Sequence, residues 1–409
     1  MPELKPFKGI RYSSSADLKD LVCPPYDVIS ADEQARLHDR HPNNAVRLEL
    51  ARPDGGAEKY RNATSAFNDW MAQGILVADD AESLYVYRQD FETPNGDRHR
   101  VAGVIGALEL EPFGETSGVL PHEKTMPGPK EDRLALMRAL PMNVSTIYAI
   151  YRGGGGLAPF LDALENRPPE ARFVDEAGIL HRLWVIRAPA EIEMLSDAMR
   201  TGPLVIADGH HRYETALAYH EENAGEPGDH GTIMCFCVDA DAEGLVVLPY
   251  NRALRTTVEP TEIADRLVQR FGAQSIGSTP HDEALRGSDA DHPIVFVTER
   301  DSLLIEVSDD EVVGVIGDRH PAWRALDVVA LHQAILPELL PEGIDELTFS
   351  KDADAIRKLV SEGWSLGVLL RAVSAAEIVD VAGSGERMPQ KASYFWPKAL
   401  TGLVYHPLS

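Results

Sequence analysis

The chain has 409 residues, and 44% of them are hydrophobic, which is enough for two or three domains with sizeable cores. Its 39 Lys and Arg residues against 65 Asp and Glu residues give a net charge of −26, which disfavours nucleic acid as the main partner. The same acidic balance is typical of a salt-adapted or GC-rich host. No apolar run approaches the ~20 residues of a membrane span, and no apolar signal core follows the N-terminus. We therefore expect a cytoplasmic protein with no membrane partner.

The first part of the chain predicts a helix followed by a hairpin. Apolar residues recur at helical spacing over 60–71. Strand-like runs over 83–91 and 100–110 follow, and Asn95-Gly96 between them is typical of a β-hairpin turn.

The remainder alternates between strand and helix patterns. Strands are expected at 145–151, 181–188, 203–208, 232–239, 244–250, 293–299 and 302–308, helices at 189–200, 212–223, 259–271 and 326–336, and a polar loop at 278–292. These patterns predict the α+β class, with mixed sheets and helices. Domain boundaries near 112 and 250 give an N-terminal α/β domain over 1–112, a core over 113–250 and a C-terminal α/β domain over 251–409.

The stretch Asp208-Gly209-His210-His211-Arg212 lies where a predicted buried strand turns into a predicted helix. The free amides and the positive end of that helix favour an anion, and Gly209 lets a ligand approach the backbone. Arg212 offers a planar fork of donors that matches phosphate oxygens, and the two histidines can donate to further oxygens. We interpret this turn as a phosphate-binding site.

Asp208 would repel a bare phosphate, so it needs another role, such as binding Mg²⁺, orienting a histidine or accepting a proton. The structural alternative is that Asp208 caps the helix and Arg212 forms an ordinary ion pair. Two adjacent histidines and an arginine beside a buried strand are costly without a ligand, which favours the binding site. Zinc is disfavoured, because no HExxH or CxxC motif accompanies the histidines.

A second charged stretch, 119–140, begins as a Gly/Pro-rich loop and continues as a predicted helix from about Lys130. Lys124, Lys130 and Arg133 could close on phosphates, and Glu123 is a candidate general base for a hydroxyl. The alternative is a solvated charged loop whose acidic residues favour the first turn of the helix.

Two further segments carry weaker signals. The Pro-Pro turn at 23–27 is interpreted as structural, although Asp27 could reach a site. The segment 388–398 combines aromatic residues, which we expect to pack in a core, with Lys391 and Lys398, which could complete an anion site.

These motifs together resemble a large bacterial and archaeal family, the domain of unknown function numbered 1015, whose members are sometimes labelled as relatives of the ParB/Spo0J partition proteins. The matching pieces are VCPPYDVIS at 22–30, HEKT at 122–125, KEDR at 130–133, ADGHHRYETAL at 207–217 and GERMPQKASYFWPK at 385–398. Family members usually read Met-Pro-Pro-Lys-Ser-Thr in the last piece, whereas Ala392 follows Lys391 here.

The turn is also similar to the phosphate-binding turn of the ParB–sulfiredoxin superfamily, in which free-serine kinases carry an upstream Leu-x-Pro-His-Glu segment. The segment LPHE at 120–123 is one residue shorter. The resemblance implies a ParB/sulfiredoxin-like core, nucleotide phosphates bound by His210, His211 and Arg212, Glu123 as the base, and Asp208 as a metal-linked or catalytic acid. It also implies ATP or ADP and Mg²⁺ as cofactors.

The leading hypothesis is phosphoryl transfer from a nucleotide to a small hydroxyl metabolite, with free L-serine as the first candidate. The alternative is a regulatory protein that binds a nucleotide or metabolite without turnover. The candidate catalytic residues are Glu123 and Asp208, the latter also a candidate Mg²⁺ ligand, and the candidate cofactor-binding residues are Gly209, His210, His211, Arg212, Lys124, Lys130, Arg133 and Lys391.

Overall fold

A computed structural model of the chain describes residues 2–13, 16–52, 58–93, 96–114, 116–123 and 128–409. The chain forms two compact units. Unit 1 comprises Met1–Pro121, Thr125–Val246 and Pro397–Ser409, and unit 2 comprises His122–Lys124 and Val247–Trp396. The chain therefore enters unit 2 twice and ends in unit 1. The boundaries near 112 and 250 stay a prediction.

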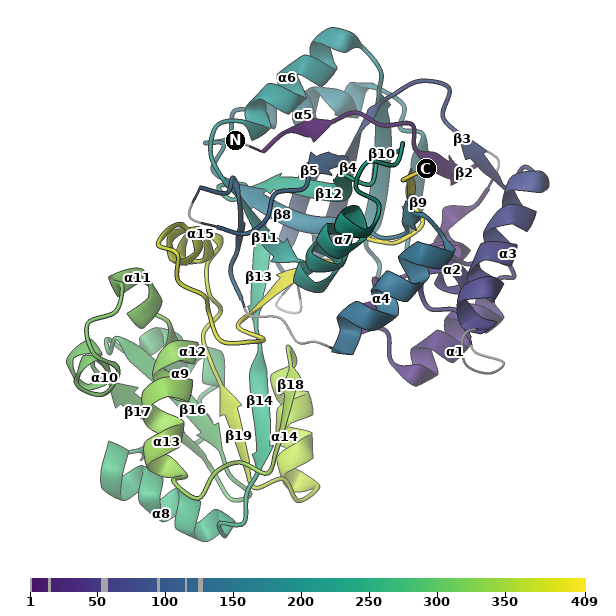
Figure 1. The fold of residues 1–409 in the computed structure, drawn as a ribbon. Coiled ribbons are helices and arrows are strands. Elements are labelled where there is room, and N and C mark those ends of the chain that lie inside the picture. The colour runs from purple at the N-terminus through teal and green to yellow at the C-terminus, as the bar shows by residue number, and fades with distance from the viewer. Residues whose placement is uncertain (1, 14–15, 53–57, 94–95, 115, 124–127) are drawn as a thin grey trace. The chain divides into compact units, whose positions relative to one another are not determined.

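Unit 1 is built on a mixed sheet of nine strands (Figure 1). Eight follow the order β6-β11-β8-β12-β5-β4-β10-β9, and β1 pairs with β5. Two neighbouring pairs, β6 with β11 and β8 with β12, are parallel, and the other pairs are antiparallel. The strands are β1 (Leu4–Lys5), β4 (Leu84–Glu92), β5 (Arg98–Glu109), β6 (Val119–Pro121), β8 (Ile147–Tyr151), β9 (Ala171–Val174), β10 (Leu180–Ile186), β11 (Leu204–Asp208) and β12 (Thr232–Asp239).

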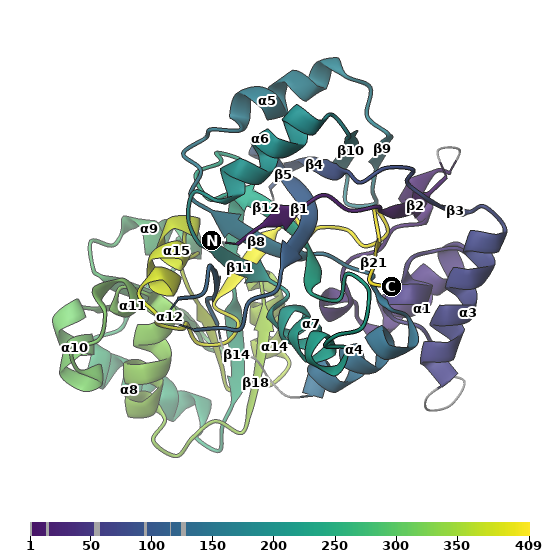
Figure 2. The same cartoon turned by 45° about the horizontal axis from the view of Figure 1, so that its top comes forward.

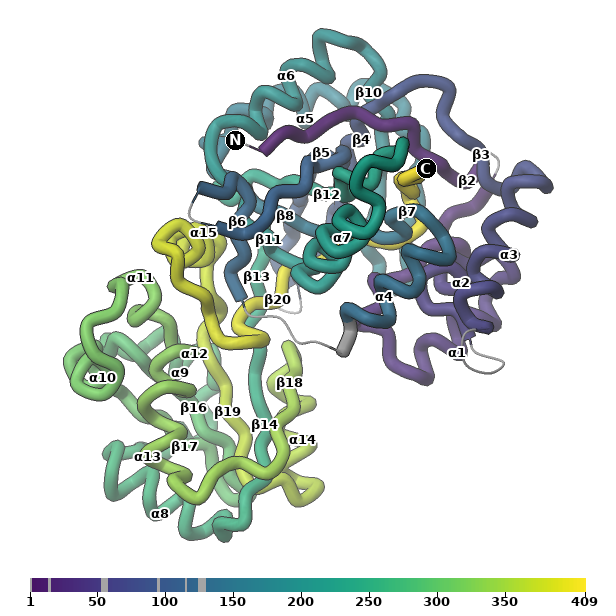
Figure 3. Tube along the Cα trace, in the orientation of Figure 1, coloured from purple at the N-terminus to yellow at the C-terminus, as the bar shows by residue number. Residues whose placement is uncertain are grey.

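Helices α5 (Ala158–Ala163), α6 (Pro189–Met199) and α7 (His210–Glu222) share one apolar core with this sheet. A second core lies among α2 (Val46–Glu49), α3 (Glu58–Ala72), α4 (Gly128–Ala139) and the short strands β2 (Ile10–Tyr12), β3 (Leu76–Ala78) and β7 (Met142–Asn143). α1 (Ala31–Arg40) packs against α2, and α4 packs against α7, which lies beside it in two views (Figures 1 and 2). The C-terminal strand β21 (His406–Pro407) pairs with β7 (Figure 3).

Unit 2 contains an antiparallel sheet of six strands in the order β15-β17-β16-β19-β14-β18. These strands are β14 (Asn251–Arg255), β15 (Gln274–Ser275), β16 (His292–Val297), β17 (Ser302–Val307), β18 (Glu346–Ser350) and β19 (Leu366–Leu369), and β13 (Val246–Pro249) pairs separately with β20 (Ser393–Trp396). The helices are α8 (Pro260–Phe271), α9 (His281–Gly287), α10 (Asp309–Ile316), α11 (Pro321–Arg324), α12 (Asp327–Ala330), α13 (Leu336–Leu339), α14 (Ala353–Ser361) and α15 (Ala375–Gly383). α9 and α14 contribute to one apolar core with the sheet, and α8 packs against β17.

The predicted α+β class is confirmed, and so are its most strongly patterned elements. The helix expected over 60–71 is α3, and the expected hairpin is β4 with β5. The helix expected from Lys130 is α4, which begins two residues earlier at Gly128. Within the described residues, no helix combines the length and apolar character that crossing a membrane requires.

The polar loop expected over 278–292 is wrong in its middle, where the chain forms α9. Asp282 and Glu283 lie in the first turn of α9, where they complement the positive end of the helix. Leu285 is 3% exposed and packs into the core of unit 2. Packing of this one leucine therefore stabilises a short helix, which the polar composition of the segment did not predict.

Gly103 provides a test of the central packing of unit 1. A Cβ atom at Gly103 would lie 2.4 Å from the carbonyl oxygen of Cys237 on the adjacent strand. We expect Gly103→Ala to lower the free energy of unfolding by about 1–3 kcal/mol, since β5 is held on both sides by β12 and β4. The matched control is Gly202→Ala, which meets nothing within 4 Å. Equal urea unfolding midpoints for the two variants would contradict the packing.

Candidate functional site

The candidate phosphate-binding turn joins β11 to α7 as the sequence predicts. Gly209 has φ 90° and ψ 28°, a left-handed conformation, and a Cβ there would lie 2.9 Å from Ile147 Cγ2. The first backbone bond of α7 is donated by Tyr213 N to Gly209 O at 3.0 Å. The amides of 210–212 precede that bond and lie at the positive end of the helix, where an anion is favoured.

Asp208 is an ionised carboxylate held between two cations. Its Oδ2 accepts from Arg212 Nη2 at 2.6 Å and its Oδ1 accepts from Lys398 Nζ, while its side chain is only 14% exposed. Burial acts to raise the pKa of Asp208, but Lys398 and Arg212 more than offset it, so the pKa lies well below its usual range. Gly209 is the N-cap residue of α7, and the ion pair between Arg212 and Asp208 is the one that the structural alternative expects.

Arg212 points into unit 1 and ties the turn to the start of β8. Its Nη1 donates to the carbonyl oxygen of Thr146, and its Nη2 donates to Asp208. Its Nε is buried and has no hydrogen-bond partner among the described residues. Two of the three guanidinium nitrogens therefore bond to protein acceptors, and Arg212 braces the turn against the start of β8.

The Pro-Pro segment at 23–27 comes to the same region of unit 1. Burial acts to lower the pKa of Arg212, but Asp208, Asp27, Tyr26 and Glu49 raise it above its ordinary value. These charges act on Arg212 because they lie close to it. Asp27 thus contributes to the electrostatic environment of Arg212, and a role for Asp27 in the site stays a prediction.

Glu49 is a functional candidate that the sequence reasoning missed. Its side chain is 1% exposed, and its Oε1 accepts from Tyr26 N at 3.1 Å and from Ser145 Oγ at 2.9 Å. Glu49, Arg133 and Arg212 also line a cavity of about 40 Å³, which has room for ordered water. Glutamate in a four-residue helix carries no sequence signal that would single it out.

The candidate cations of α4 are paired with protein groups. Arg133 is 7% exposed, donates from Nη1 to the Glu49 carbonyl oxygen at 2.7 Å, and lies 4.3 Å from the Tyr26 ring centroid. Lys130 forms an ion pair with Glu214 of α7. The candidate Lys124 lies outside the described residues.

His122 and Glu123 belong to unit 2, where they run along the segment at 388–393. His122 is 1% exposed and shares a hydrogen bond of 3.0 Å with Ser393 Oγ through Nε2. Glu123 Oε2 accepts from the backbone N of Lys391 at 3.2 Å. The structure thus brings together two motifs about 270 residues apart, because His122 and Ser393 are separated by 271 positions.

Lys391 adopts a left-handed backbone conformation with φ 57°, the one positive φ at a described residue other than glycine. Its carbonyl oxygen accepts from Arg252 Nη2 at 3.1 Å. Arg252 is 1% exposed, and burial lowers its pKa to about 9. Arg252 therefore supports the backbone of Lys391, which in turn binds Glu123. The sequence did not predict this role, because Arg252 lies within an ordinary strand pattern.

The donor set at Asp208 does not fit a resident Mg²⁺ ion. Both carboxylate oxygens already accept from cationic side chains. Across the described parts of the chain, no group of three or more His, Cys, Asp or Glu side chains could hold a metal ion. Magnesium needs oxygen ligands with unspent negative charge, and the protein offers none here.

The ionised state of Asp208 gives stability a pH dependence. Because its pKa is lowered on folding, its contribution is complete above the unfolded value of about 3.9 and is lost as the pH falls below it. We expect Asp208→Asn to lower the free energy of unfolding at neutral pH by about 3 kcal/mol, since two buried cations lose their counter-charge. We expect that difference to shrink as the pH falls from about 5 toward 3.

Urea unfolding of both proteins across this pH range measures the effect. The control is Asp69→Asn, because Asp69 is exposed on α3 and has no ion-pair partner in the described structure. We expect it to change stability by no more than about 0.5 kcal/mol at any pH. A difference for Asp208→Asn that does not depend on pH would contradict the assigned charge state.

Comparison with known proteins gives distant structural likeness. A variant of free serine kinase in complex with ADP superposes with a TM-score of 0.35 and 14% identity, covering 68% of this chain and 84% of the other. Free serine kinase in complex with AMP gives 0.35 and 15%, covering 68% and 83%. C-terminally truncated SbnI from Staphylococcus aureus gives 0.39 and 11%, covering 73% and 85%. At these scores the likeness does not bear on function.

No curated protein matches the sequence. A family match covers residues 4–329, which takes in the Pro-Pro segment, Glu123 and the turn at Asp208 but ends before the segment at 385–398. The chain therefore belongs to the family described as Protein of unknown function (DUF1015).

Proposed function

We propose that the protein transfers a phosphoryl group from ATP or ADP to the hydroxyl of a small metabolite, with free L-serine as the first candidate. The hydroxyl oxygen forms a bond to the terminal phosphorus of the nucleotide, and the bridging P–O bond to the leaving nucleotide breaks. Glu123 takes the hydroxyl proton. Such transfer depends on positioning and charge stabilisation, which the residues of this chain can supply.

The observation that carries the proposal is the turn before α7. The first amides of α7 lie at the positive end of the helix, and Lys398 and Arg212 both pair with Asp208 beside it. His210 and His211 begin the helix itself. Two cationic side chains at a helix N-terminus form a place that suits nucleotide phosphates.

Lys398, one of the two lysines that could complete an anion site, is assigned to the phosphates here, and Arg212 takes a different part. Because Arg212 is braced against Thr146 and Asp208, it orients the turn. In the proposed function His210, His211 and Lys398 contact the phosphates, and Asp208 positions Lys398. No step is assigned to a protein-bound metal.

Glu123 is the proposed general base. Its carboxylate accepts a hydrogen bond from the backbone N of Lys391 at 3.2 Å, which helps to fix its direction. A general base must come within about 2.6–3.2 Å of the hydroxyl oxygen whose proton it takes. The choice of L-serine rests on the resemblance of the segment at 120–123 and of the turn to free-serine kinases.

A second candidate function is nucleotide binding without turnover, within a ParB-like regulatory protein. The engaged state of Asp208 favours it, because both carboxylate oxygens are bonded to cations and neither is available as a catalytic acid. The two functions share the phosphate site and differ in whether a product forms.

The test mixes purified protein with Mg²⁺, L-serine and either ATP or ADP, and measures O-phosphoserine by mass spectrometry. Phosphoserine formation supports the kinase. Nucleotide binding without a phosphorylated product from serine, threonine or homoserine overturns it in favour of the regulatory protein. A structure with ADP and serine bound would place Glu123 within hydrogen-bond distance of the serine Oγ, and a Glu123 remote from that atom would remove it from the role of base.

Removal of the base should abolish transfer but preserve binding. We expect Glu123→Gln to lower the rate of phosphoserine formation by about 10²–10⁴-fold, because the amide cannot accept the proton. Thermal stabilisation by nucleotide should be unchanged. The control is Glu131→Gln, an exposed position in the first turn of α4, which should retain full activity. Equal rates for the two variants would exclude Glu123 as the base.

Loss of one phosphate contact should weaken nucleotide binding. A nucleotide at a hundredfold excess over its dissociation constant should stabilise the unsubstituted protein by about 2.7 kcal/mol. We expect most of this gain to vanish in His211→Ala and to remain in His281→Ala, a control on α9. Differential scanning fluorimetry with ADP measures both. If ADP stabilises His211→Ala as much as the unsubstituted protein, the N-terminus of α7 does not take part in nucleotide binding.

A further inference from the structure

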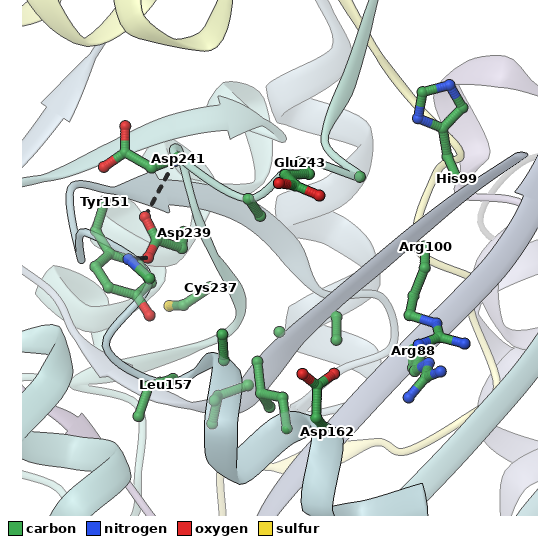
Figure 4. A pocket seen from close by; sticks show the side chains of 18 of the residues that line it. Arg88, His99, Arg100, Tyr151, Leu157, Asp162, Cys237, Asp239, Asp241 and Glu243 are labelled. Carbon is green, nitrogen blue, oxygen red and sulfur yellow. Dashed lines mark hydrogen bonds between the residues drawn. The ribbon is translucent and has the colours of Figure 1, made fainter. Parts of the chain in front are cut away.

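Unit 1 contains a second cavity, of about 730 Å³, that the proposed function does not use. Its walls come from β4, β5, the end of β12 with the loop that follows, and α5 (Figure 4). Tyr148 pairs with Asp208 on β11, whereas the cavity is lined by Tyr151, three residues farther along β8. Three strand residues span about 10 Å, so the cavity is a site distinct from the turn before α7.

One side of the cavity carries arginines that β4 and β5 hold on a common face. In this antiparallel pair Arg88 lies opposite Ala102, and Asp90 lies opposite Arg100. Arg88 is 1% exposed and pairs with Glu165, and its Nε is buried with no partner in the described structure. Arg88 therefore lies beneath the cavity surface, where its ion pair helps to hold Glu165 beside Arg100.

Arg100 completes this basic wall. Its Nε donates to Asp90 at 3.0 Å and its Nη1 lies 3.0 Å from Glu165. Its side chain is nevertheless 50% exposed, so it can turn part of its donor fork to a ligand. Arg98 lies two residues before Arg100 on β5, so the two side chains share one face of the sheet. The Arg98 side chain is 87% exposed.

The other side of the cavity carries carboxylates (Figure 4). Asp239 accepts from the backbone N of Gly153 at 3.0 Å and of Gly155 at 2.8 Å, so it fixes the glycine run at 153–156. Asp241 and Glu243 follow on the same loop, are exposed, and have no ion-pair partner among the residues that the structure describes. This wall thus offers two uncompensated negative charges.

The lining between the two walls is largely apolar, although it includes the carboxylate of Asp162 on α5 (Figure 4). Ala102 and Val104 come from β5, and Leu157 and Leu161 come from α5 and the residue before it. An aliphatic chain could lie across these side chains with its two ends at opposite charges.

We propose that this cavity binds a zwitterionic metabolite, with its ammonium group at Asp241 and Glu243 and its carboxylate at Arg98 and Arg100. The acidic wall repels a nucleotide triphosphate, and the basic wall repels a simple polycation, whereas an ω-amino acid satisfies both. This site is independent of phosphoryl transfer, and its test needs no activity.

Isothermal titration calorimetry of the full chain with 6-aminohexanoate as the probe tests the proposal. Hexanoate and hexylamine each keep one charged end and the same chain, so they should bind about tenfold or more weakly than the zwitterion. Glu243→Gln and Arg100→Gln should each weaken binding of 6-aminohexanoate by a similar factor. Glu193→Gln, an exposed change on α6 with the same loss of charge, should leave it unchanged.

Three results would overturn the proposal. The first is no saturable binding of 6-aminohexanoate at millimolar concentration, with circular dichroism showing folded protein. The second is hexylamine binding as tightly as the zwitterion, which would leave the arginines without a part. The third is an equal loss of affinity for 6-aminohexanoate in Glu193→Gln and Glu243→Gln. That result would mean that the overall negative charge of the protein, and not the acidic wall, attracts the ligand.

Discussion

The buried carboxylate of Asp208 is the interaction on which the candidate phosphate site depends. It holds Lys398, which is 190 positions away in the sequence, and Arg212, which in turn holds the carbonyl of Thr146. One negative charge therefore joins the C-terminal segment, the turn before α7 and the approach to β8. Each cation is tolerable in the interior because this counter-charge is present, and each would be costly without it.

The segment at 388–398 serves both units through two lysines seven positions apart. Lys391 lies in unit 2, where its backbone N fixes Glu123 and its carbonyl is held by Arg252. Lys398 lies in unit 1, where it pairs with Asp208. The proposed base and the proposed phosphate site are thus each supported by the same short stretch of chain. The left-handed backbone of Lys391 lies at the position whose N donates to Glu123.

Unit 1 contains two candidate binding sites with different charge patterns, and they lie at different positions along the strands of its sheet. The turn before α7 has cations gathered about one carboxylate and suits a dense anion. The cavity over β4 and β5 sets arginines opposite carboxylates across an apolar floor and suits a molecule with both charges. The overall charge of −26 predicted neither, because ligand recognition depends on local charge and burial rather than on the sum.

The sequence by itself determined the elements whose signal is local. Periodicity predicted α3, the turn pair predicted the hairpin of β4 and β5, and a buried run followed by glycine predicted the change from strand to helix at Gly209. Only the tertiary structure decided that Lys398 pairs with Asp208, that Glu49 lies beside the arginines, and that α9 forms around one buried leucine. Those outcomes depend on contacts between distant positions, and spacing along one chain carries no record of which distant side chain will supply a counter-charge or a packing surface.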